Sequence, residues 1–262
     1  MRKIILLCSV LVCLSACKTE PTIAPKMPQQ LITGFFTQGI AGLDTIAGLM
    51  QCVNIKMENP FNPLDTPSLT NGYTDASFRN QLWEVAVPAD VKLNGTTIVL
   101  IGKSNFTYNI PNFGITHRWQ ITANSSGSVP TIDDSVQSPS AFHVTFPRSL
   151  KDTVSKTSGF TCTYGNPGTD SATLMIYYDS VVTLMSDSSI HYPKGLPVYV
   201  TVANTGSYYV SSSLLSSLPN SGAIQVWVTA RRSKKLTLSG RVYLISSVSG
   251  GRVHCNIKNS TN

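Results

Sequence analysis

The sequence contains few charged residues: Asp, Glu, Lys and Arg make up only 13% of its 262 residues, while 42% are hydrophobic. That balance excludes a disordered chain, which has the opposite composition. Six Cys are too few for a small domain built on disulfides. Ser, Thr, Gly and Pro are abundant instead of the Glu, Lys, Ala and Leu of a helical bundle. The composition therefore favours β-structure, in one large domain or in two of about 100–120 residues.

The N-terminus has the three parts of a secretion signal. Arg2 and Lys3 precede an apolar run from Ile4 to Leu14, and two small residues then lead to Cys17. The run is too short for a membrane-spanning helix, which needs about 20 apolar residues, but it has the length and the flanks of a signal peptide. We therefore interpret residues 1–16 as a signal peptide.

The end of this signal, Leu14-Ser15-Ala16-Cys17, resembles the lipobox of bacterial lipoproteins. The resemblance implies cleavage before Cys17 and acylation of its thiol and its new amino group, by palmitate or a similar chain. It also implies a protein held by lipid in the cell envelope of a Gram-negative bacterium, at the outer membrane, because several acyl chains anchor a protein stably. The alternative is an ordinary secreted protein with an incidental Cys.

Beyond the signal, the sequence reads as strands and turns. Apolar and polar residues alternate with period two, and turn residues bound each run. Short strands at this spacing, without intervening helices, predict an all-β fold of one or two antiparallel β-sandwich domains. The predicted strands cover 53–57, 82–87, 97–101, 106–110, 115–121, 142–146, 160–164, 172–178, 198–202, 224–228, 236–238, 242–245 and 253–257.

Changes in composition suggest how the mature chain is divided. The predicted parts are a lipidated Cys and tether at 17–40, an N-terminal sandwich-like domain at 41–124, a linker or long loop at 125–140, and a C-terminal sandwich at 141–262.

The C-terminal part resembles a known domain type. Its pattern Gly206-Ser207-Tyr208-Tyr209-Val210, then Leu214-Leu215 and Leu218-Pro219, then a strand from Ile224, is similar to the late strands of immunoglobulin-like domains on bacterial surface lipoproteins. The resemblance implies an immunoglobulin-like β-sandwich.

The sequence contains no motif of an enzyme or metal site. There is no Gly-x-Ser-x-Gly elbow, phosphate-binding loop or His-Glu-x-x-His helix. The histidines lie apart from one another and from other ligand residues, which predicts structural roles for His117, His143, His191 and His254. Only carboxylates brought together by the fold could cleave glycosides. We therefore predict a protein that is not an enzyme and uses no cofactor or metal.

Three Cys remain after Cys17. Cys162 and Cys255 each alternate with apolar neighbours, so both are predicted to face the core of one sandwich. They form either an inter-strand disulfide or two buried thiols, and Cys52 makes the number odd. The three Trp residues, Trp83, Trp119 and Trp227, also fit inward-facing positions.

Two groups of side chains are candidate ligand contacts. Adjacent Tyr rings in a strand point to opposite faces, so one of each pair can stack on a sugar or cover a neighbouring strand. A basic run between two strand patterns predicts a hairpin tip that would meet anionic lipid or acidic polysaccharide, or else a solvated turn that prevents edge pairing. The candidates are Tyr177, Tyr178, Tyr208, Tyr209, Arg231, Arg232, Lys234 and Lys235.

Five of the ten Asp residues begin a triplet of Asp, a hydroxyl residue and a small or apolar residue. Composition alone would give roughly one such triplet. The pattern resembles an O-glycosylation sequon of exported proteins in one Gram-negative phylum. Turn chemistry before a strand is the alternative explanation. The implied glycan sites are Thr45, Ser135, Thr153, Ser171 and Ser180.

These features together predict an envelope lipoprotein that binds without catalysing a reaction. Its partners would be the membrane, through the lipid, and a glycan or an envelope protein; a nucleic-acid partner is not expected. The first alternative is a structural subunit of an envelope assembly, and a less favoured one is a glycan-processing enzyme.

The glycosylation pattern makes a prediction about mass. The mature protein purified from its native host is expected to be heavier than acylated polypeptide, because the triplets carry glycan. Intact-mass spectrometry measures this directly, and a mass equal to polypeptide plus lipid alone would contradict the prediction.

Overall fold

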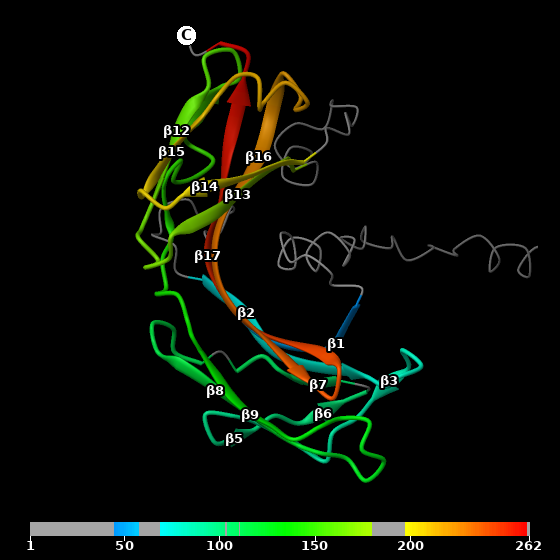
Figure 1. The fold of residues 1–262 in the computed structure, drawn as a ribbon. Helices are drawn as coiled ribbons and strands as arrows, with labels where there is room; N and C mark the ends of the chain where they lie inside the picture. The colour runs from blue at the N-terminus through cyan, green and yellow to red at the C-terminus, as the bar shows by residue number, and fades with distance from the viewer. Residues whose placement is uncertain (1–44, 58–68, 103, 110, 180–196, 261–262) are drawn as a thin grey trace, which may run out of the picture. The chain divides into compact units, whose positions relative to one another are not determined.

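A computed structural model describes residues 45–57, 69–102, 104–109, 111–179 and 197–260 (Figure 1). This part of the chain forms seventeen strands in three sheets, and it contains no α-helix. The predicted all-β fold with antiparallel sheets is confirmed. The predicted sites Cys17 and Ser180, and also His191, lie outside the described residues.

The largest sheet has ten strands and is organised around two long neighbours, β16 and β17. On one side of this pair lie β13 and β14; on the other lie β1, β2, β7 and β6, with β3 on the edge of β2 and β11 on the edge of β17. The strands are β14 (Val198–Ala203), β13 (Ser171–Tyr178), β16 (Ser221–Leu238), β17 (Arg241–Lys258), β1 (Ile46–Met57), β2 (Leu69–Arg79), β7 (Ser104–Thr107), β6 (Leu100–Ile101), β3 (Val85–Ala86) and β11 (Thr153–Ser155).

The β16–β17 hairpin pairs all 18 residues of each strand without a register shift. Its turn consists of Ser239 and Gly240, both with positive φ (51° and 73°). Such a two-residue turn matches the twist of antiparallel strands and fixes their register. β1 and β11 add to β17 in parallel, one after the other along the same edge. The sequence pattern did not predict these two parallel pairings.

Two smaller sheets complete the fold. One has three strands, β10 (Val144–Phe146), β12 (Phe160–Tyr164) and β15 (Ser207–Val210). The other has four, β5 (Thr96–Thr97), β4 (Asp90–Leu93), β8 (Thr116–Thr122) and β9 (Ile132–Gln137). Figure 1 shows them beside opposite ends of the β16–β17 hairpin.

Each small sheet contributes to its own hydrophobic core on the large sheet. The first core contains Val226 of β16 with Cys162 of β12; the second contains Ile245 of β17 with Trp119 of β8. Even-numbered residues of β16 such as Val226 belong to the first core, and the even-numbered Leu236 packs against the second core. Because strand side chains alternate with period two, both cores lie on the same face of the hairpin. We call this the core face.

On β17, the middle of the core face carries small residues, where the chain passes from one small sheet to the other. Ser249 Oγ donates a hydrogen bond of 2.8 Å to the Ser140 carbonyl oxygen. At Gly251, an added Cβ would lie 2.5 Å from the backbone nitrogen of Val144 and 2.8 Å from the Cα of His143. The close approach of this backbone requires a glycine.

The structure corrects the predicted division of the chain. Residues 125–140, interpreted as a linker or long loop, include β9, which pairs with β8 and contributes Ile132 and Val136 to the second core. The β16–β17 hairpin supplies both cores, although it lies wholly within the predicted C-terminal part at 141–262. Strand pairing and the sharing of one hairpin between two cores leave no signal in local composition.

Two local predictions are also wrong. The basic run from Arg231 to Lys235 is not a hairpin tip, because it lies inside β16 and the turn comes at Ser239. The predicted strand at 82–87 is a turn followed by the short β3, and Trp83 is 46% exposed. Trp119 and Trp227 are buried as predicted.

We expect Gly251→Ala to lower the free energy of unfolding by about 1–3 kcal/mol, because the new methyl group overlaps the crossing backbone. Urea denaturation monitored by tryptophan fluorescence measures the change. Ser233→Ala, at an exposed position of β16, is the control and should change the value by less than about 0.5 kcal/mol. Equal stabilities of the two variants would contradict the proposed contact.

Candidate functional site

Three loops meet at the end of the large sheet where the β16–β17 hairpin turns. They are 80–84, which joins β2 to β3; 124–130, which joins β8 to β9; and the turn at 239–241. We call this group the tip site. Its loops come from three regions distant in the sequence, and hydrogen bonds hold each of them in one conformation.

Asn80 organises the first loop. Its Oδ1 accepts hydrogen bonds from the backbone N–H groups of Leu82 (2.8 Å) and Glu84 (3.0 Å), and its Nδ2 donates to Glu84 Oε2 at 2.9 Å. The backbone closes the same turn, since the Trp83 N–H donates to the Asn80 carbonyl oxygen at 3.1 Å. Asn suits this role because its short amide bonds the backbone that follows it.

The loop exposes two large apolar side chains. Leu82 is 77% exposed and Trp83 is 46% exposed. Trp83 has a φ of 63°, in the left-handed region, which costs a residue with a Cβ about 1 kcal/mol. The hydrogen bonds of Asn80 stabilise this conformation. The result is a rigid turn that presents apolar surface to solvent, an arrangement typical of contact sites.

Asn124 organises the second loop in the same manner. Its Oδ1 accepts from the Val129 N–H at 3.2 Å, and its Nδ2 donates to Ser128 Oγ at 2.8 Å and to the Val87 carbonyl oxygen at 3.0 Å. The last bond connects this loop to the segment that follows β3. Ser126 Oγ lies 2.9 Å from Ser128 Oγ.

Arg241 joins the loops to the hairpin. Its NH1 donates to the Ser128 carbonyl oxygen at 3.0 Å, and its NH2 donates to the carbonyl oxygens of Asn80, at 2.8 Å, and Arg79. Its guanidinium carbon lies 6.0 Å from the centroid of the Tyr243 ring. The rigid fork of arginine donors therefore braces three segments at once.

Between these loops lies a pocket of about 350 Å³, near the lower limit for small-molecule sites. Its walls are mainly amide and hydroxyl groups with one exposed aliphatic side chain. None of the described residues that line it carries a carboxylate. The lining residues are Asn80, Gln81, Leu82, Ser126, Gly127, Ser128, Pro130, Ser239, Arg241 and Tyr243.

An exposed apolar strip follows the sheet edge beside this site. β3 and β7 both pair with the edge of β2 that faces away from β1, and β6 extends β7 outward. Val85 is 48% exposed on β3, and Val99, Leu100 and Ile101 are 49–60% exposed at β6. Exposed aliphatic residues on a sheet edge can pair with or pack against another protein.

The predicted Tyr pairs lie apart from this site, Tyr177 and Tyr178 on β13 and Tyr208 and Tyr209 on β15 of the three-stranded sheet. Tyr209 is 56% exposed, whereas Tyr208 packs against the first core. The Tyr209 hydroxyl donates to the Ser158 carbonyl oxygen, and its ring lies against the turn at Gly159. Tyr209 thus covers a neighbouring turn. Tyr177 and Tyr178 are half-buried.

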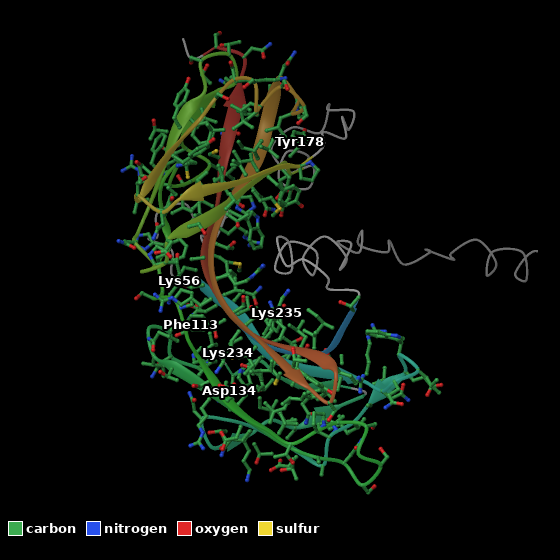
Figure 2. All side chains as sticks on the ribbon, viewed as in Figure 1. Lys56, Phe113, Asp134, Tyr178, Lys234 and Lys235 are labelled. Carbon is green, nitrogen blue, oxygen red and sulfur yellow. The ribbon has the colours of Figure 1, made fainter. Side chains whose placement is uncertain are left out.

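Strand alternation separates the four basic residues of β16. Arg232 and Lys234 point to the core face, where Arg232 donates to the Gly168 carbonyl oxygen and Lys234 Nζ lies 2.6 Å from Asp134 Oδ1 (Figure 2). Arg231 and Lys235 point to the opposite face. Burial lowers the pKa of Arg231 to about 10. The basic run therefore does not form one cationic patch.

A row of polar side chains crosses β13, β16 and β17 on the face opposite the cores. The Gln225 side chain accepts from the Tyr177 hydroxyl and from Trp227 Nε1, and it donates to Asp179 Oδ2. The same Asp179 oxygen lies 3.2 Å from His254 Nε2. Burial is the main cause that raises the pKa of Tyr177. Because this network is buried, it satisfies polar groups inside the protein.

The three Cys side chains that the structure describes are also buried. Cys162 and Cys255 are free thiols in the first core, which agrees with the second predicted alternative, two buried thiols. Cys52 is a free thiol in the second core. Burial raises the pKa of Cys52 and of Cys162 to about 12, so both remain protonated.

The histidines that the structure describes do not gather into a ligand cluster. His117 bonds Ser247 Oγ and the Asn112 carbonyl oxygen, each at 2.8 Å, and burial lowers its pKa. The described residues contain no group of three or more His, Cys, Asp or Glu side chains placed to hold a metal. They also include no helix that is long and apolar enough to cross a membrane.

The predicted glycan sites differ in their exposure. Thr45 and Ser171 are exposed, at the start of the described chain and at the start of β13. Ser135 and Thr153 are half-buried in β9 and β11, where their backbones pair with other strands.

Two comparisons with known proteins found no relative of this chain. No protein-family model matches the chain. A search of curated proteins also found no match.

The tip site was not predicted from the sequence, because the pattern at 82–87 indicated a strand with an inward-facing Trp83. The available signal was Asn80, a residue typical of turns, four positions before Glu84. The other two loops could not be connected to it from sequence, since Arg241 is 161 positions away from Asn80 along the chain.

We expect Asn80→Ala to release the first loop. The amides of Leu82 and Glu84 lose their acceptor, so their hydrogen exchange should accelerate by about tenfold, while global stability falls by about 1 kcal/mol. Hydrogen-exchange mass spectrometry measures the rates. Glu84→Ala is the control, because it removes only an exposed partner of Asn80 Nδ2; unchanged exchange in Asn80→Ala would refute the role of Asn80.

Proposed function

We propose that this protein is a lipid-anchored lipoprotein of the Gram-negative cell envelope and that it acts as a non-catalytic binding or adhesion module for glycan or protein. The lipobox-like sequence ending at Cys17 supports the anchor. The tip site supports the binding role, and it replaces the Tyr pairs and the basic run as the proposed contact surface.

The observation that carries the proposal is the rigid exposure of Leu82 and Trp83 beside a formed pocket. Two Asn side chains and one Arg side chain hold the loops through hydrogen bonds with backbone groups. A preorganised surface loses little conformational entropy on binding, which increases affinity. Exposed Trp is also enriched among the residues that dominate binding energy.

The burial of the Asp179–His254 pair and of the Cys thiols, together with the lining of the tip pocket, favours a role without catalysis. Catalysis needs an acid, base or nucleophile that can reach a substrate. The Asp179–His254 pair is buried, with 9% and 3% of the two side chains exposed, and Gln225 also occupies its carboxylate. The Cys thiols that the structure describes are buried, and burial raises the pKa of Cys52 and Cys162. The tip pocket has no carboxylate among its lining residues.

One observation favours the second candidate, a structural subunit of an envelope assembly. The apolar strip at Val85 and Val99–Ile101 follows a sheet edge, where another protein chain could pair or pack. This surface lies beside the tip site but does not line its pocket.

The binding role is tested with the full acylated protein in detergent, screened against a glycan array and against purified outer-membrane proteins. We expect a ligand whose affinity falls at least about tenfold in Leu82→Ser/Trp83→Ser, because apolar contact area is lost. Tyr209→Ala, which removes an exposed ring elsewhere, should bind normally.

Binding that disappears in Tyr209→Ala but survives in the tip variant would refute this site. A protein partner that is lost only when Leu100 and Ile101 are changed to Ser would favour the structural subunit.

A further inference from the structure

The tip pocket contains polar side chains that make no hydrogen bond, or only one, to other described residues. The side chains of Gln81 and Ser239 line it without a hydrogen-bond partner among the described residues. The Ser126 hydroxyl bonds only Ser128 there and keeps capacity for a second hydrogen bond. Together these groups offer an amide and two hydroxyls, which can both donate to and accept from a ligand.

The pocket offers little recognition of charge. Its one ionised lining residue, Arg241, directs both terminal nitrogens to backbone carbonyl oxygens of the surrounding loops. Those bonds brace the pocket and leave the guanidinium fork unavailable for bidentate binding of a carboxylate or phosphate. The position of Arg241 therefore does not favour binding of an anion.

The pocket also has an apolar side. Leu82 lines it, and Trp83 is the next residue in the same rigid turn. Sugars combine a ring of hydroxyl groups with apolar C–H faces, so they need this combination of neutral hydrogen-bonding groups and exposed apolar surface. The volume of about 350 Å³ suits a small ligand or the end of a chain.

We propose that the tip pocket binds the end of a neutral carbohydrate chain, with Gln81, Ser126 and Ser239 bonding its hydroxyls and Leu82 contacting its apolar face. This inference rests on the proposed binding function and specifies its ligand class.

The test compares neutral and acidic oligosaccharides on a glycan array, followed by calorimetric titration of the best binder to the acylated protein. Binding to a neutral sugar is expected, with affinity changing less than about twofold between 50 and 500 mM NaCl because no ion pair forms. Gln81→Ala/Ser239→Gly should weaken it by about tenfold through loss of two hydrogen bonds. Glycine suits the positive φ of Ser239, so the variant should keep its melting temperature.

Each other outcome is decisive. Binding only to acidic sugars, or binding that high salt abolishes, would overturn the neutral ligand. A silent array together with tip-dependent binding to an outer-membrane protein or to phosphatidylethanolamine vesicles would overturn the carbohydrate and leave a binding module. No binding to any probe would overturn both proposals.

Discussion

The continuous pairing of β16 with β17 is the constraint on which the rest of the structure depends. Eighteen residue pairs in one register keep every second side chain on the core face from one end of the hairpin to the other. Val226 therefore serves the first core and Ile245 the second without any separate framework. A one-residue slip would turn both sets of apolar side chains away from their cores. The two small sheets consequently pack on the same face of one continuous hairpin.

The tip site depends on the same hairpin. Its turn places Ser239 in the pocket wall and positions Arg241 to brace the loops that follow β2 and β8. The tip site thus takes most of its side chains from loops, while the strands and the half-buried guanidinium of Arg241 connect these loops. This combination resembles many ligand sites, in which a stable β-scaffold presents variable loops. It also explains how Trp83 can keep an unfavourable backbone conformation in solvent.

Much of the local structure could be predicted from sequence. Period-two alternation identified β8, β12 and β13 closely, and it placed Cys162 and Cys255 in one core. Two of the errors share one cause. Local composition made the polar residues near Ile132 resemble a linker and the basic run at Arg231 resemble a turn, although both lie in strands paired with the neighbouring strand of a hairpin. Pairing with another strand outweighs local propensity, and it is not visible in a short window.

The sequence by itself determined the all-β class, the strand periodicity and the expectation of a lipid anchor at Cys17, because each of these depends on residues that are neighbours along the chain. Only the tertiary structure decided which strands pair, how the basic side chains of β16 divide between two faces, and where the pocket of the tip site lies. Asn80, Ser126 and Ser239 meet because three loops converge at one sheet end. That convergence depends on the long-range register of the large sheet.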